Sequence, residues 1–202
     1  MKKIVTLILA FVICFALVSC GSPSPTDVTD SFLKAVKAQD AEEMAKVYAG
    51  DDFKVLDDDG EEKEVLGALE KSIMTKFFDF EYKIANEKID GDKAKVDVTF
   101  KTYKMGNAFT AFIGEYFSQA LGLAFSGASD KQVEELAETL FTEQLDKLTK
   151  KDYTKTVSVS LEKVDDQWKI SELDEESDVL NAMSGGLIEA INNTSNAFND
   201  AE

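Results

Sequence analysis

The apolar residues near the start of the folded region repeat at helical spacing. A first helix is expected to begin at Thr26 or Asp27, either of which can cap it. Further helices are expected over Ala41–Ala49 and over about Lys63–Phe78. The apolar face of the first helix comprises Val28, Phe32, Ala35 and Val36.

The period then changes to alternation, which is typical of half-buried strands. Apolar and polar residues alternate strictly over 94–101 and again over 157–162, and weaker strands are expected at 82–89 and from Trp168. Asp90-Gly91 predicts a tight hairpin turn, and Asp165-Asp166 turns the chain a second time. The sequence therefore predicts an antiparallel sheet built from two hairpins.

Between the hairpins, about residues 105–152 return to helical periodicity. Ser129 and Gln132 form a capping box in the middle, which predicts an insertion made of two antiparallel helices with facing apolar stripes. If one stripe is not fully covered, it is a groove for a partner. A final helix, interrupted at Gly185-Gly186, is expected over about Glu176–Asn192, with a polar tail over 193–202 that frays.

The first 25 residues carry the features of an export signal. Residues 1–19 read as a signal peptide, because two lysines precede an apolar run of fifteen residues broken only by Thr6. The sequence Leu17-Val18-Ser19-Cys20 resembles the lipobox of bacterial lipoproteins. That resemblance implies lipidation of Cys20, for example with palmitate chains, and an extracytoplasmic domain held at the cell membrane. The alternative is an ordinary secretory signal that is cut after Ser19.

Residues 20–25 then form the lipidated cysteine and a short tether, and 26–192 form a single domain. The chain contains neither Arg nor His, and its net charge is −17. The lack of His excludes imidazole bases and ligands, and the acidic charge argues against nucleic acid as a partner. Cys14 leaves with the signal peptide, so the folded domain has no disulfide or catalytic thiol.

The order of elements resembles the nuclear-transport-factor-two-like superfamily of cone-shaped domains. The resemblance rests on Phe32, on residues 82–96, on Trp168-Lys169-Ile170 and on residues 184–187. It implies an α+β fold in which N-terminal helices pack on a curved antiparallel sheet, with the helical hairpin as an insertion. None of these motifs is catalytic.

Six aromatic residues are expected to converge near the junction of the third helix and the sheet. They would either line a pocket for a small apolar ligand or form simple core. These residues are Phe77, Phe80, Tyr82, Phe100, Tyr103 and Trp168. An enzyme would instead need a carboxyl group with a raised pKa in the cone, assisted by tyrosine. The candidates for that chemistry are Glu81, Tyr82, Asp97 and Tyr103.

No cofactor or metal is expected. The acidic run from Asp57 to Glu62 does not fit an EF-hand, because Gly60 at loop position 6 places Val55 and Leu66 at ligand positions 1 and 12. The sequence favours a non-catalytic module that binds an apolar ligand or an envelope protein. A structural or assembly lipoprotein acting through the helical insertion, or an acid–base enzyme, are the alternatives.

Overall fold

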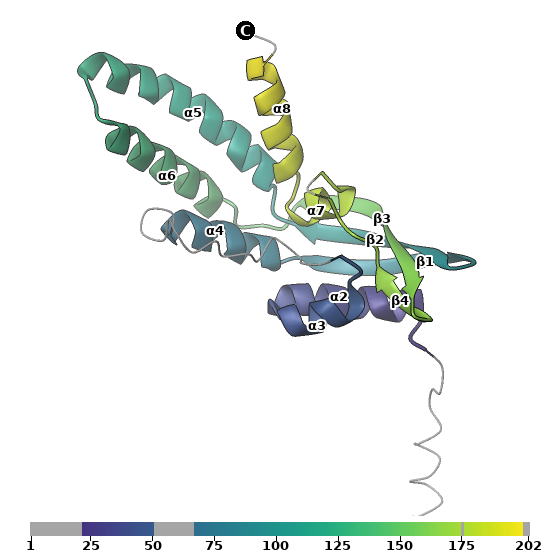
Figure 1. The fold of residues 1–202 in the computed structure, drawn as a ribbon. Coiled ribbons are helices and arrows are strands. Elements are labelled where there is room, and N and C mark those ends of the chain that lie inside the picture. Colours follow the sequence, from purple (N-terminus) through teal and green to yellow (C-terminus); the bar gives the residue numbers. More distant parts are fainter. Residues whose placement is uncertain (1–21, 51–66, 175, 200–202) are drawn as a thin grey trace, which may run out of the picture.

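A computed structural model of the protein describes residues 22–50, 67–174 and 176–199, and Figure 1 shows its arrangement. The described part is an α+β fold, as the sequence predicts. The signal peptide, Cys20 and the acidic run at 57–62 lie outside the described residues. The helices are α2 (Pro25–Ala38), α3 (Ala41–Val47), α4 (Gly67–Phe78), α5 (Met105–Ser126), α6 (Asp130–Asp146), α7 (Asp178–Met183) and α8 (Leu187–Asn199). The strands are β1 (Glu81–Asp90), β2 (Lys93–Thr102), β3 (Tyr153–Val164) and β4 (Gln167–Ile170).

The four strands form one antiparallel meander in the order β1-β2-β3-β4. Both predicted hairpins are confirmed. The first turn is shifted by one residue, because Asp90 pairs with Lys93 and leaves Gly91-Asp92 in the turn. The second turn is Asp165-Asp166, and both residues have positive φ, as a two-residue turn requires.

One face of this sheet forms the main core with the N-terminal helices. Alternate residues of β2 and β3 are buried there, and α2 and α7 contribute apolar side chains to the same cluster. Helix α2 begins earlier than predicted, because Ser24 rather than Thr26 or Asp27 caps it. The Ser24 hydroxyl accepts a hydrogen bond from the Asp27 N–H, and the Asp27 carboxylate accepts one from the Ser24 N–H.

The predicted helical insertion is confirmed as the antiparallel pair α5 and α6, and it extends away from the end of the sheet (Figure 1). The predicted capping box of Ser129 and Gln132 begins α6. A second, smaller core holds this pair together with α4, and its buried members are Met105, Ala108, Phe141 and Leu145.

The end of the chain differs in part from the prediction. The predicted interruption at Gly185-Gly186 is confirmed, and it divides the expected helix over Glu176–Asn192 into two helices, α7 and α8. The predicted fraying from Asn193 is wrong, because α8 continues to Asn199. The physical reason is packing on α5: the ring centroids of Phe117 and Phe198 lie 5.4 Å apart.

Candidate binding surface

The six aromatic residues expected either to line a pocket or to form core lie in packed clusters. Phe77, Phe80 and Phe100 are buried, and the rings of Phe80 and Phe100 pack edge to face with centroids 5.6 Å apart. Tyr82 and Trp168 pack on the same cluster, whereas Tyr103 belongs to the second core. None of the six lines either of the two cavities described below. Their positions favour the core interpretation.

The predicted acid–base residues lie in separate groups: Glu81 and Tyr103 both lie near Lys151, whereas Tyr82 and Asp97 have other partners. Tyr82 donates a hydrogen bond to Asp30, at 2.8 Å, and Tyr103 donates one to Asp79, also at 2.8 Å. Asp97 lies on the outer face of β2, where the Ser158 hydroxyl donates to it at 2.6 Å. The bonds of Tyr103 and Asp97 are exposed, that of Tyr82 is partly buried, and each joins neighbouring elements.

The electrostatics of these groups oppose acid–base use. A hydrogen bond from Lys34, and then one from Tyr82, lowers the pKa of Asp30. The Lys151 ammonium lowers the pKa of Asp79, and burial is the first cause that raises the pKa of Tyr82. Among the described Asp and Glu residues, every resolved shift in pKa is downward. A general acid at neutral pH needs the opposite shift.

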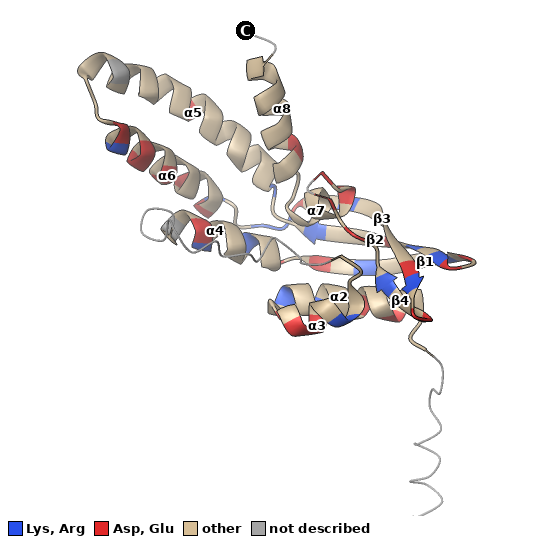
Figure 2. Ribbon diagram, in the orientation of Figure 1, with Lys and Arg blue, Asp and Glu red and all other residues tan. Residues whose placement is uncertain are grey.

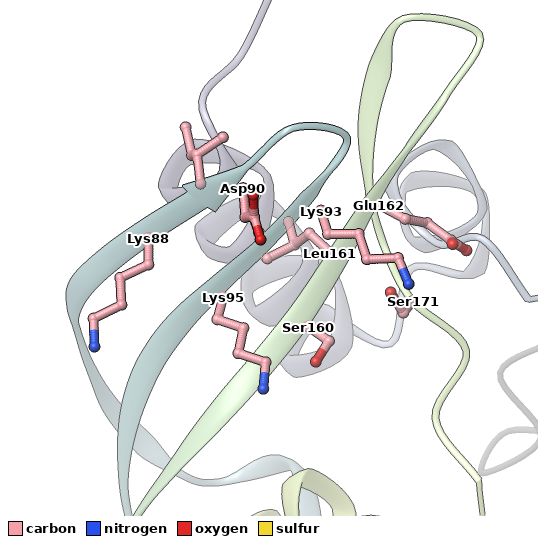
Figure 3. A pocket seen from close by; sticks show the side chains of 10 residues that line it. Lys88, Asp90, Lys93, Lys95, Ser160, Leu161, Glu162 and Ser171 are labelled. Atoms are coloured by element: carbon pink, nitrogen blue, oxygen red, sulfur yellow. The ribbon is translucent and has the colours of Figure 1, made fainter.

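A first cavity, of about 470 Å³, lies where β1, β2 and β3 approach the β1–β2 turn (Figure 3). Three lysines line it, Lys88, Lys93 and Lys95, and Lys88 lies directly opposite Lys95 in the register of the two strands. None of the three forms an ion pair with another described residue. The carboxylates of Asp90 and Glu162 in the same lining offset most of their charge, so this cavity has no strong preference for either sign.

A second cavity, of about 620 Å³, runs between α5 and α8, and we call it the α5–α8 groove. Glu189 is its only charged lining residue, and the side-chain amide of Asn181 donates a hydrogen bond to that carboxylate at 3.3 Å. Ligand sites in proteins typically have volumes of this order and few charges. The lining residues include Thr110, Ile113, Tyr153, Ala190, Asn193, Ala197 and Phe198.

Three glycines bring the walls of the groove together. The Gly106 N–H donates to the Gly185 carbonyl at 3.1 Å, and a Cβ on Gly106 would lie 2.4 Å from the carbonyl oxygen of Gly186. Only residues without a side chain permit this approach of α5 to the α7–α8 turn. Sequence reasoning noted the pair Gly185-Gly186 as an interruption of a helix, and it missed their partner on α5.

Beyond the groove, large apolar side chains of α5 and α8 are exposed. The exposed fractions are 44% for Phe117, 61% for Leu121 and 91% for Phe125 on α5, and 40% for Ile191 and 49% for Phe198 on α8. Figure 2 shows that both helices are nearly without charge, and Glu115 and Glu189 are their only charged residues. An uncharged apolar surface of this kind on an acidic protein is typical of an interaction site.

Within the residues that the structure describes, no group of three acidic or cysteine side chains is arranged to hold a metal ion. Over the same residues, no helix combines the length and apolar character needed to cross a membrane.

Comparisons with known proteins give little further information. No family profile matches the chain, and no curated protein matches it. A crystal structure from Bacillus subtilis, described as a "putative lipoprotein (ycdA)", is similar over 64% of this chain at 22% identity, with a TM-score of 0.41. This chain covers 38% of that protein's length. The resemblance to the nuclear-transport-factor-two-like superfamily stays a prediction.

Proposed function

We propose that this protein is a lipid-anchored extracytoplasmic binding protein of a bacterial cell envelope, without a catalytic role. The single observation that carries the binding function is the α5–α8 groove, whose described lining carries one charge, that of Glu189, and which has apolar surroundings on a chain whose net charge is −17. The groove would receive a small apolar ligand or an apolar segment of an envelope protein. The anchor is supported by the lipobox-like sequence that ends at Cys20.

The fold supports a separation between the anchored end and the binding end. The Thr26 N–H donates to the Glu87 carboxylate at 2.8 Å, so the start of α2 lies beside β1 near the β1–β2 turn. Helix α5 starts after Thr102, at the far end of β2. At 3.3 Å per residue, the strand between these points spans roughly 20 Å, and the groove begins at Gly106, in the first turn of α5. A short tether would therefore hold the groove away from the lipid surface.

The absence of His, together with the downward pKa shifts of the described aspartates, favours binding over acid–base catalysis. An assembly role through the helical insertion, the alternative from the sequence, would use the same exposed apolar side chains. Both roles share one prediction, which is that the α5–α8 end is occupied in the cell.

The ligand form of the proposal can be tested by native mass spectrometry of the full lipoprotein, released from membranes in mild detergent. Ala197 lines the groove and its neighbour Asn196 does not. We expect an additional non-covalent mass on the wild-type protein and on Asn196→Trp, and its loss from Ala197→Trp, whose indole fills the groove. An additional mass that is equal in all three proteins, or absent from all, contradicts binding of a ligand in the groove.

A further inference from the structure

The outer face of α5, which we define as the side turned away from α6, carries a ridge of large side chains beside a groove of small residues. Phe117, Leu121 and Phe125 are spaced four residues apart and form the ridge. Gly114, Ser118 and Gly122 have the same spacing and form the small-residue groove. A Cβ on either glycine would meet no atom within 4 Å, so nothing in the described structure occupies this groove.

The ridge and the small-residue groove each follow a row of residues spaced i, i+4, and this spacing determines how another helix can pack on them. When two helices interdigitate such rows, their axes cross at about −50°. A helix that carries both features side by side is complementary to a copy of itself, because a twofold axis places each ridge in the other copy's groove. The outer face of α5 therefore has the shape of an isologous interface.

The distribution of charge selects the same partner. Two copies that each carry a net charge of −17 repel one another, and contact is least unfavourable across a surface without charge. The one charged residue of α5, Glu115, accepts a hydrogen bond from Gln144 of α6 at 2.8 Å, on the side of the helix pair. The neighbouring helix α6 exposes Glu134 and Glu135, so a copy that approached through α6 would meet like charge.

From this shape and this lack of charge we propose that a second copy of the chain packs on the outer face of α5, so that the protein is a twofold dimer through this helix. The inference rests on the proposed function in one respect: each copy has its own lipid anchor, and anchoring both copies in one membrane raises their effective concentration. Phe117 contacts Phe198, which lines the α5–α8 groove, with ring centroids 5.4 Å apart, so the proposed interface and the groove adjoin at this residue.

Single-cysteine cross-linking tests the dimer in the full lipoprotein, because the mature chain has no thiol besides Cys20, which the lipid blocks. Ser118→Cys places a thiol in the small-residue groove, and Thr139→Cys places one on the exposed surface of α6 as a matched control. Isolated membranes are treated with a short bis-maleimide. We expect a product of twice the protomer mass from Ser118→Cys, at least tenfold more abundant than from Thr139→Cys.

Adding Gly122→Leu to Ser118→Cys fills the small-residue groove without a clash inside the protomer, and we expect at least a tenfold loss of this product. Equal products from the two cysteine sites, no product from Ser118→Cys, a product of a different mass, or no loss with Gly122→Leu would each overturn the dimer. A product of twice the mass from the unmodified chain would instead reveal a free Cys20 thiol, and would refute the lipid anchor alone.

Discussion

Gly185 is the residue whose substitution tests most directly how α8 is held against α5. It has a φ of +63°, and a Cβ at this position would lie 1.7 Å from the Tyr103 carbonyl oxygen and 3.2 Å from the Met105 nitrogen. Both of these atoms belong to the backbone that joins β2 to α5. A methyl group can enter only if one of the two chain segments moves.

The magnitude of the effect of Gly185→Ala follows from two costs. An alanine in the left-handed region costs roughly 1–2 kcal/mol relative to glycine. Overpacking against rigid neighbours adds about 1–3 kcal/mol. We therefore expect the free energy of unfolding to fall by roughly 2–5 kcal/mol, which corresponds to a decrease in Tm of roughly 4–20 °C for a domain of this size.

Urea titration followed by far-ultraviolet circular dichroism, at low protein concentration, measures this change. Gly114→Ala is a matched control, because Gly114 lies in a helix and has open space around its Cβ position. We expect the control to gain about 0.5–1 kcal/mol from its higher helix propensity. A Gly185→Ala protein that unfolds at the wild-type urea concentration would refute the tight contact between the α7–α8 turn and α5.

Further predictions concern the anchor, the core and the dependence on pH. Cys20→Ala should release the protein from membranes and block its maturation, and unchanged retention in a membrane fraction would contradict the anchor. Thr102→Val should raise the free energy of unfolding by about 1 kcal/mol, because the buried Thr102 hydroxyl has no hydrogen-bond partner among the described residues. A lower free energy of unfolding in urea titration would contradict this. The pKa values of Asp30 and Asp79 are lowered in the folded protein, so their ionised carboxylates stabilise it above about pH 4, the pKa of an unfolded aspartate. This stability should be lost as the pH falls below that value. Equal urea midpoints at pH 6 and pH 2.5 would contradict this. The pKa of Tyr82 is raised in the folded protein, so the free energy of unfolding should fall above about pH 10, where the tyrosine of the unfolded chain ionises first. The fall should be smaller in Tyr82→Phe. An identical fall in both proteins would refute the role of this residue.

The sheet and the helical insertion were predictable because local pattern determines them. Strict alternation over 94–101 and 157–162 has one solution that buries every apolar residue, and both strands form as expected. The capping box at Ser129 likewise fixes the start of α6. Such features depend on neighbours within a few residues, and no knowledge of the tertiary structure is needed to find them.

The candidate site was less predictable because it depends on contacts between distant segments. The α5–α8 groove exists because Gly106 meets Gly185 and Gly186, about eighty residues further along the chain. The helical state of Asn193–Asn199 also depends on α5, since the segment itself is polar apart from Ala197 and Phe198. The sequence left open whether Phe80 and Phe100 line a pocket or form core, because composition alone does not distinguish a filled core from a lined cavity.

Site-specific photo-cross-linking in intact bacterial cells tests most directly whether the α5–α8 end is a binding surface. A photoreactive amino acid is placed at Thr110, which lines the groove, or at Thr156, which lies on the outer face of the sheet and serves as the control. The account predicts discrete cross-linked products from position 110 that are absent from position 156. Products from position 156 alone, or from neither position, would contradict the assignment of the α5–α8 end as the binding surface.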